Sequence, residues 1–232
     1  MIFKQVCDAS FLLDYAGTRF LINPAFGEKG MSELAVPLRE LLDADAVIVT
    51  RLSGSCFDEA ARQLLPRAIK IFVPNAIAQV ELEGIGFTNV EVLTEYTRFQ
   101  YLDVKKMPSF RSSQGKLKMD EKGCGVLISH PVLNSAYITG GSVFAPGVKE
   151  LIQTYKPRLI LIHVGGGQLL DKQRFYMNQE EIAAVHLTMP KARLIAVKTE
   201  TLEADKLENY LYEHQMLNSV LIPEYGKEYR LI

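Results

Sequence analysis

Residues 46–58 read Ala-Val-Ile-Val-Thr-Arg-Leu-Ser-Gly-Ser-Cys-Phe-Asp. The first part, 46–50, has no charged residue, which is typical of a strand buried on both faces of its sheet. Residues 51–56 form a loop rich in Ser and Gly, and a helix is expected over 57–65. Asp58 falls in the first turn of that helix, where the helix dipole favours a carboxylate. The stretch therefore predicts a strand, a loop and a helix of an α/β protein.

The segments around this unit are arranged as two similar halves. Apolar runs on either side of Ala16-Gly17 predict a hairpin over 9–22, and a second hairpin is expected over 124–139. Each hairpin is followed by alternating helices and strands. The expected helices are 33–42, 57–65, 75–83, 145–155, 178–188 and 202–215, and the expected strands are 46–50, 69–74, 90–94, 159–164, 192–198 and 218–222.

The strands of the two halves follow the same order. Val47 corresponds to Ile160, Ile71 to Leu194 and Val92 to Val220, and the polar stretch 111–122 is the expected connector. Two β-rich layers with helices outside predict an α/β fold, specifically a four-layer αβ/βα sandwich. We expect one domain over 1–232, built from halves at about 1–115 and 116–232. The alternative, one doubly wound parallel sheet, agrees less well with a hairpin at the start of each half.

The overall composition argues against nucleic-acid and membrane partners. The chain has 232 residues, of which 48% are hydrophobic and 23% charged, with a formal net charge of −1. Such a balance gives no long-range attraction to a polyanion. No apolar run approaches the ~20 residues that span a bilayer, and the start does not resemble a signal peptide. The three distant cysteines, Cys7, Cys56 and Cys124, favour reduced thiols and hence a cytoplasmic location.

Seven short segments occur in an order and spacing that resemble one known family. They are Cys7-Asp8-Ala9-Ser10-Phe11, Ile22-Asn23-Pro24, Thr50-Arg51-Leu52-Ser53-Gly54-Ser55-Cys56-Phe57-Asp58, Pro108-Ser109-Phe110-Arg111, Tyr137-Ile138-Thr139-Gly140-Gly141-Ser142, Met177-Asn178-Gln179-Glu180-Glu181 and Ile222-Pro223-Glu224-Tyr225-Gly226. Together they resemble the metallo-β-lactamase superfamily, in its ascorbate-6-phosphate-lactonase-like branch. The resemblance spans nearly the whole chain and implies the four-layer sandwich of that family.

The resemblance also places the family's metal ligands on this chain. The corresponding positions are Arg51, Ser53, Ser55, Cys56, Arg111, Gly141 and Lys198, with Asp8 at an additional early position. Arginine has no lone pair to offer a metal, lysine must first lose its proton, glycine has no side chain, and serine is a poor zinc ligand. Cys56 and Asp8 alone are too few, because catalytic zinc takes three protein ligands and an open position. We therefore expect no metal cofactor, a degenerate metal site and a pseudoenzyme.

The four histidines do not restore the family's ligand set. His130, His163, His186 and His214 all lie outside the ligand positions, and His163 at the end of the strand 159–164 is the best remaining candidate. The simpler interpretation of His163 is a histidine hydrogen-bonded at a strand end. The alternative is an atypical zinc or manganese site made by Asp8, Cys56 and His163. Such a site would make the chain a metal-dependent hydrolase, of lactonase or phosphodiesterase type.

The substituted residues also indicate a positive function. Arg51, Arg111 and Lys198 are expected to converge where the family binds metal, and two unit charges ~6 Å apart repel by roughly 3 kcal/mol at an effective dielectric of ~20. A phosphate or carboxylate would balance them, with help from backbone amides of Gly54, Gly140-Gly141 or Gly165–Gly167. The alternative is that these side chains extend into solvent.

We therefore expect a non-hydrolytic protein that binds a small anionic molecule, or serves as a scaffold or regulatory partner, rather than an enzyme. A purely structural subunit of a homo-oligomer remains a third interpretation. Cys56, near Arg51 at a helix start, is also a candidate for a thiol of depressed pKa, against the simpler interpretation of an inert buried cysteine.

Overall fold

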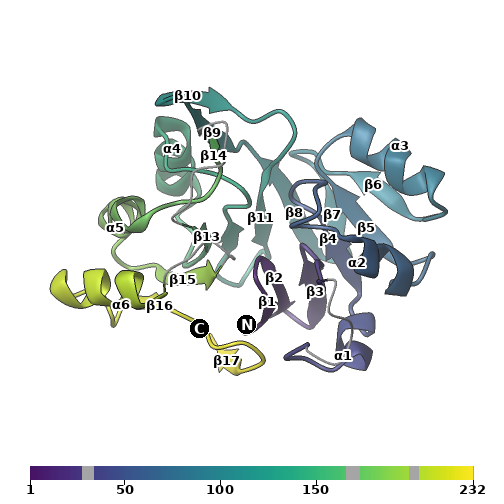
Figure 1. The fold of residues 1–232 in the computed structure, drawn as a ribbon, viewed down its shortest axis with the longest axis horizontal. Helices are drawn as coiled ribbons and strands as arrows, with labels where there is room; N and C mark the ends of the chain where they lie inside the picture. Colours follow the sequence, from purple (N-terminus) through teal and green to yellow (C-terminus); the bar gives the residue numbers. More distant parts are fainter. Residues whose placement is uncertain (28–33, 166–172, 199–203, 232) are drawn as a thin grey trace. The chain divides into compact units, whose positions relative to one another are not determined.

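The computed structural model describes residues 1–27, 34–165, 173–198 and 204–231. The chain forms two compact units, one of Met1–Thr94 with Pro223–Ile232 and the other of Glu95–Ile222. Figure 1 shows the elements of both units along the chain. The organisation of residues 1–232 as a single domain stays a prediction.

The first unit contains one mixed sheet and three helices. Its elements are β1 (Ile2–Cys7), β2 (Ser10–Tyr15), β3 (Thr18–Ile22), α1 (Leu38–Leu42), β4 (Ala46–Ile48), α2 (Glu59–Leu64), β5 (Lys70–Val73), α3 (Ala76–Gly84), β6 (Val90–Val92) and β17 (Glu228–Arg230). The strand order is β17-β1-β2-β3-β4-β5-β6. β17, β1, β2 and β3 are joined by antiparallel pairs, and β3 to β6 by parallel pairs.

Local sequence explains where these elements turn and begin. Ala16 and Gly17 join β2 to β3 with φ angles of 53° and 84°, as the predicted hairpin requires. The side chain of Asp58 accepts a hydrogen bond from the Ala61 N–H and caps α2, and Asn75 does the same for α3 through Ala78. Asp58 therefore precedes α2 as its N-cap instead of lying inside the first turn.

Both faces of the first sheet are buried. Its helices pack on one face, where Leu41 of α1, Ala61 of α2 and Leu82 of α3 join a core cluster with strand residues such as Val47 and Ile71. The other face carries side chains of the alternate strand positions, which are also buried: Phe11, Leu13, Phe20, Ile22, Ile48 and Phe72. This double burial accounts for the continuous apolar strands of the sequence.

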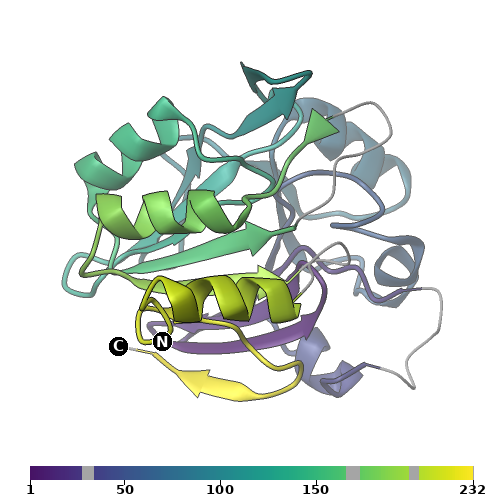
Figure 2. The ribbon, with the colours of Figure 1, turned by 60° about the vertical axis from the view of Figure 1, so that its left-hand side comes forward.

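The second unit repeats the same plan. Its elements are β7 (Arg98–Phe99), β8 (Leu102–Met107), β9 (Phe110–Ser113), β10 (Lys116–Met119), β11 (Gly125–Ser129), β12 (Ala136–Ile138), α4 (Pro146–Tyr155), β13 (Leu159–Val164), β14 (Gln173–Arg174), α5 (Gln179–Thr188), β15 (Arg193–Lys198), α6 (Ala204–Glu213) and β16 (Val220–Leu221). The main sheet has the order β16-β15-β13-β12-β11-β8-β7. The helices α4, α5 and α6 lie side by side over one face (Figure 2) and contribute to the core cluster of this unit.

The two sheets have corresponding strand orders. In each sheet an antiparallel set (β1-β2-β3 and β8-β11-β12) leads into parallel strands (β3-β4-β5-β6 and β12-β13-β15-β16). Val47, Ile71 and Val92 lie in β4, β5 and β6, and their counterparts Ile160, Leu194 and Val220 lie in β13, β15 and β16. The fold class is therefore α/β, as predicted.

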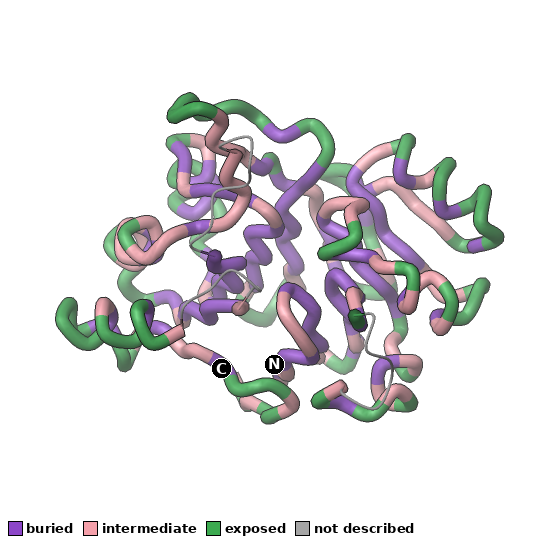
Figure 3. Tube along the Cα trace, viewed as in Figure 1, coloured by how far each residue is buried: buried purple, intermediate pink, exposed green. Residues whose placement is uncertain are grey.

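Two local expectations were wrong. The polar stretch 111–122 was expected to connect the two halves, but it lies inside the second unit, where β9 and β10 form a hairpin that joins β14 in a three-stranded sheet of order β10-β9-β14. Figure 3 shows the exposed end of this hairpin. Residue 33 of the helix expected over 33–42 lies outside the described residues, and within 34–42 only α1, Leu38–Leu42, is helical, because Pro37 stands at its N-cap with an extended ψ of 135°. Within the described residues, no helix is long and apolar enough to cross a membrane.

Candidate functional site

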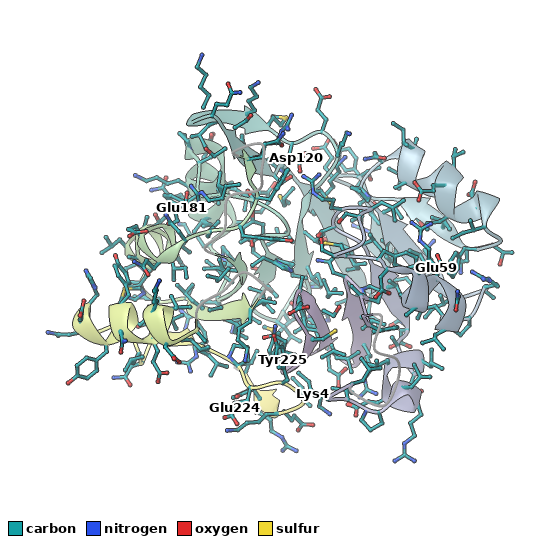
Figure 4. All side chains as sticks on the ribbon, in the orientation of Figure 1. Lys4, Glu59, Asp120, Glu181, Glu224 and Tyr225 are labelled. Atoms are coloured by element: carbon teal, nitrogen blue, oxygen red, sulfur yellow. The ribbon has the colours of Figure 1, made fainter. Side chains whose placement is uncertain are left out.

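Asp8 lies in the tight connection between β1 and β2. Its φ is 24°, and its backbone carbonyl accepts a hydrogen bond from the Gln5 side-chain amide. Its carboxylate Oδ1 accepts a hydrogen bond from the Tyr225 hydroxyl at 3.4 Å. Tyr225 belongs to the C-terminal segment, which returns to β1 through a bridge between Tyr225 and Gln5 (Figure 4). The C-terminal segment therefore holds the first candidate residue in place.

Asn23 connects the ends of two adjacent parallel strands, β3 and β4. It is fully buried with a φ of 48°, and its backbone N–H donates to the Ile48 carbonyl at 2.9 Å. Its side-chain Oδ1 accepts from the Thr50 N–H at 2.8 Å and from the Thr50 hydroxyl at 3.1 Å. These contacts set the start of the loop that carries Arg51. Sequence reasoning used Asn23 only as a landmark and missed this role.

The loop after β4 carries four candidate residues, Arg51, Ser53, Ser55 and Cys56. The Ser53 carbonyl accepts hydrogen bonds from the Cys56 and Phe57 N–H groups at 2.9 and 2.8 Å, and the Ser53 and Ser55 hydroxyl oxygens are 3.2 Å apart. Cys56 is only 4% exposed, and its burial raises the thiol pKa, although Ser53, Ser55 and Arg51 oppose the rise. This direction agrees with the interpretation of Cys56 as an inert buried cysteine and not with a thiol of depressed pKa.

Asp58 and Cys7 are occupied by structural contacts beside this loop. The two oxygens of the Asp58 carboxylate accept from the Ala61 N–H at 2.8 Å and the Gly27 N–H at 2.6 Å. The Cys7 thiol donates to the Ala25 carbonyl at 2.8 Å. Burial, together with the nearby Asp8 and Asp58 carboxylates, raises the pKa of Cys7 to about 11. These two residues therefore stabilise the loop framework of the first unit.

In the second unit, candidate residues lie at the carboxyl ends of adjacent parallel strands. The loop of Thr139–Ser142 follows β12, His163 lies near the end of β13, and Lys198 ends β15 opposite Val164. The His163 N–H donates to the Thr139 hydroxyl oxygen at 3.1 Å, and the residue is 1% exposed. His163 is thus a buried histidine tied to a strand end, which agrees with the simpler interpretation.

Arg111 lies in β9, which is attached to the same loop. The Phe110 N–H donates to the Ser142 hydroxyl oxygen at 3.0 Å, and the Val143 N–H donates to the Phe110 carbonyl at 2.9 Å. The Arg111 Nη1 donates to the Gln173 side-chain oxygen at 2.7 Å. The Arg111 Nε is buried and has no hydrogen-bond acceptor among the described residues. Arg111 is therefore fixed beside the Gly140-Gly141 turn, where Gly140 has a φ of 60°.

The structure thus brings the candidate residues together in two groups. The first unit contains Asp8 and the loop that carries Arg51, Ser53, Ser55 and Cys56. The second unit contains Arg111, Gly141 and Lys198. The convergence of all three cations stays a prediction. Gly165 is described, whereas Gly166 and Gly167 of the candidate glycine run lie outside the described residues.

The other histidines take part in local contacts. A ring nitrogen of His130 accepts from the Val132 N–H at 3.2 Å, and the His214 ring stacks on Tyr210 with centroids 4.0 Å apart. His186 lies in α5. In the described parts of the chain, no group of three His, Cys, Asp or Glu residues is placed to hold a metal ion.

The side chains at the positions that the resemblance assigns as metal ligands differ in chemistry from the usual donors to zinc. Arg51, Arg111 and Lys198 carry protons where neutral imidazoles or carboxylates are needed. Burial keeps the Cys56 thiol protonated, and a thiol must lose its proton to bind a metal. Arginine and lysine side chains, such as Arg51, Arg111 and Lys198, are of the kind that bind carboxylates and phosphates.

Comparison with curated proteins finds a relative along the whole chain. No family model matches the sequence. The chain is 32% identical over 253 aligned positions to the UPF0173 protein YddR of Bacillus subtilis (strain 168), and the match covers 99% of each protein.

Comparison with solved structures finds the same fold in several proteins. An isothiocyanate hydrolase from Delia radicum gut bacteria matches with a TM-score of 0.89 and 24% sequence identity. A possible metal-dependent hydrolase from Veillonella parvula DSM 2008 matches with a TM-score of 0.88 and 21% sequence identity. Each match covers 100% of this chain and 99% of the other chain. The metallo-β-lactamase fold protein YhfI from Bacillus subtilis matches with 0.70 and 12%, over 99% of this chain and 98% of YhfI. The predicted metallo-β-lactamase fold is therefore confirmed.

Proposed function

The chain belongs to the UPF0173 family, and we propose that it is a metal-free, non-hydrolytic protein of the metallo-β-lactamase fold that binds a small anionic ligand. One observation carries this proposal. The Arg111 guanidinium has a buried Nε without an acceptor and a Nη1 held only by a neutral amide, in the described part of the chain. A buried charged donor that lacks a hydrogen-bond acceptor lowers the stability of the folded protein. A phosphate or carboxylate would supply the acceptor, and arginine can bind either in a bidentate manner.

The surroundings of Arg111 support the same proposal. The Gly140-Gly141 turn lies beside β9 through the contacts of Phe110 with Ser142 and Val143, and turns of this kind present backbone N–H groups to anions. Lys198 ends β15 of the main sheet, in which β13 lies between β15 and β12, and the carboxyl ends of parallel strands are the usual ligand-binding edge of an α/β sheet. Arg111, Gly141 and Lys198 would therefore form an anion site within the second unit.

The names of the structural relatives favour a second candidate function. Two of them are named as hydrolases, one of them as possibly metal-dependent. Such an activity here would need an atypical zinc or manganese site made by Asp8, Cys56 and His163. It would also require the Cys56 thiol to ionise against its burial and His163 to leave its buried strand end. We favour the anion-binding function because it uses Arg111 in its protonated form.

Calorimetry and metal analysis on the same samples test the proposal. The protein is produced with added zinc and manganese, its metal content is measured, and phosphate and citrate are then titrated into it. We expect well under one metal ion per chain, millimolar or tighter binding of an anion, and loss of that binding in Arg111→Gln. Lys191→Gln, which removes an exposed charge of the same unit, is the matched control.

Two results would overturn the proposal. One is stoichiometric metal that is lost in Cys56→Ala, which would support the hydrolase. The other is an unchanged anion affinity in Arg111→Gln when thermal unfolding shows that the variant is folded.

A further inference from the structure

The hairpin of β9 and β10 gathers three cations on one face. In its register Arg111 is paired with Lys118, and Ser113 with Lys116. Residues paired across antiparallel strands, and residues two apart along a strand, share a face of the sheet. Arg111, Lys116 and Lys118 therefore lie on one face, which we call the cationic face of the hairpin. The opposite face carries Phe110, Ser112, Leu117 and Met119.

The pairing of Arg111 with Lys118 places like charges directly opposite each other. Directly paired side chains have Cβ atoms about 4.5–5.5 Å apart, and like charges in such pairs destabilise the sheet. Neither residue, nor Lys116, has an ion pair with any acid in the described ranges. The side-chain neighbours that the register gives on this face, Ser113 and Gln173, are neutral.

The other face of the same small sheet is treated differently. Arg174 of β14 is paired with Ser112, so it lies on the face opposite Arg111. Its guanidinium binds the Glu181 carboxylate through both Nη atoms and also donates to the Tyr176 carbonyl at 3.0 Å. The chain thus neutralises the arginine of one face with its own acid. The cations of the other face are left for an acid that the described residues do not provide.

Asp120 is the carboxylate that lies nearest to this face in the sequence. It follows β10, is 5% exposed, and its N–H donates to the Ser109 carbonyl at 2.8 Å (Figure 4). Its Oδ1 accepts from the Lys122 N–H at 3.3 Å. One carboxylate beyond the paired strands cannot balance three cations, so the charges of the described hairpin residues leave this face net positive.

We infer that the ligand held by Arg111 carries at least two anionic groups, as a diphosphate does, and that Lys118 and Lys116 on the cationic face bind the second group. This inference rests on the proposed anion-binding function and adds the class of ligand. Arginine would take one anionic group with its planar fork, while each lysine binds the neighbouring group as a flexible point charge. Lys116 and Lys118 are exposed, so they can reach a ligand that arrives from solvent.

Comparison of phosphate with pyrophosphate tests the inference. Both are titrated into the wild type, the double variant Lys116→Gln with Lys118→Gln, and the control Lys191→Gln. We expect the wild type to bind pyrophosphate at least about tenfold more tightly than phosphate, because a further charged contact is worth about 1.5 kcal/mol or more. In the double variant we expect pyrophosphate to bind at most about threefold more tightly than phosphate. The phosphate affinity itself should stay within a factor of about three of the wild-type value. The control keeps both affinities.

The outcomes separate this inference from the proposed function. If phosphate binding depends on Arg111 but pyrophosphate binds no more tightly, the inference is wrong and the proposed function stands. The same holds if the preference for pyrophosphate survives in the double variant. If neither anion binds to the wild type, both are wrong. Thermal unfolding of each variant shows that a lost ratio does not come from a lost fold.

Discussion

The Tyr225 hydroxyl donates a hydrogen bond to the Asp8 carboxylate over 3.4 Å, across 217 positions of sequence. Together with the bridge between Tyr225 and Gln5, this contact attaches the C-terminal segment to the turn after β1. Burial of the phenol and the Asp8 charge raise the pKa of Tyr225 to about 12, so it remains a donor at physiological pH.

Removal of this hydroxyl should weaken the attachment of the C-terminal segment. We expect Tyr225→Phe to lower the free energy of unfolding by about 0.5–1.5 kcal/mol, the value of one hydrogen bond. Chemical denaturation measures the change. Tyr212→Phe, at a tyrosine that is 73% exposed in α6, is the control and should have no effect. Equal stability of Tyr225→Phe and wild type would show that the contact contributes nothing.

Alkaline pH should destabilise the protein through Cys7. The folded-state pKa of this thiol, about 11, lies above the ordinary value of 9.0, because burial and nearby carboxylates favour the neutral form. The unfolded chain therefore releases its proton first, and the stabilising contribution is complete below about pH 9 and lost as pH rises to about 11. Unfolding curves across this range measure the loss. The Cys7→Ser variant should show a flatter dependence, and an unchanged slope would contradict the assignment.

Asn23 should be among the most sensitive positions of the first unit. Asn23→Ala removes the acceptor of two Thr50 hydrogen bonds and forces an alanine into a positive φ. We therefore expect the free energy of unfolding to fall by about 2–4 kcal/mol. Asn23→Gly relieves the backbone strain but still lacks the acceptor. It should therefore recover only the smaller part of the free energy of unfolding that Asn23→Ala loses. Full recovery of the free energy of unfolding in Asn23→Gly would show that strain alone dominates.

Relief of the like-charge pair should stabilise the ligand-free protein. We expect Lys118→Gln to raise the free energy of unfolding by about 0.2–1 kcal/mol at low ionic strength, and by less at high salt because salt screens exposed charges. With pyrophosphate present, the same variant should gain less thermal stability than the wild type. Thermal unfolding at two salt concentrations measures both effects. A variant that is less stable than wild type without ligand would argue against repulsion between Arg111 and Lys118.

Much of the fold could be predicted because its strands are buried on both faces. All residues of β13 are buried, and such runs are visible as continuous apolar segments. The β9–β10 hairpin was missed because β10 is only four residues long and fully exposed, and the alternation of Leu117 and Met119 with two lysines was interpreted as part of a polar connector. The start of α1 was misplaced because the leucine spacing extends upstream of Pro37, where the backbone is not helical.

The candidate site could be predicted in residue type but not in contacts. The resemblance pointed to Arg111. Its Nη1 contact with Gln173 depends on the pairing of β9 with β14, whose residues are 62 positions away, and the lack of an acceptor at its buried Nε is visible only in the structure. Asn23 was invisible as a functional support because its partner, Thr50, becomes adjacent only when β3 and β4 pair in parallel. The cationic face of the hairpin could be recognised only from its strand register, because a shift of one residue would move the side chains of a strand to the opposite face.

Native mass spectrometry of protein purified from cells grown with added zinc and manganese tests the central claim most directly. The account predicts the mass of the metal-free chain, with a phosphate adduct that forms on addition of phosphate and disappears in Arg111→Gln. A stoichiometric metal adduct that Cys56→Ala abolishes would contradict it.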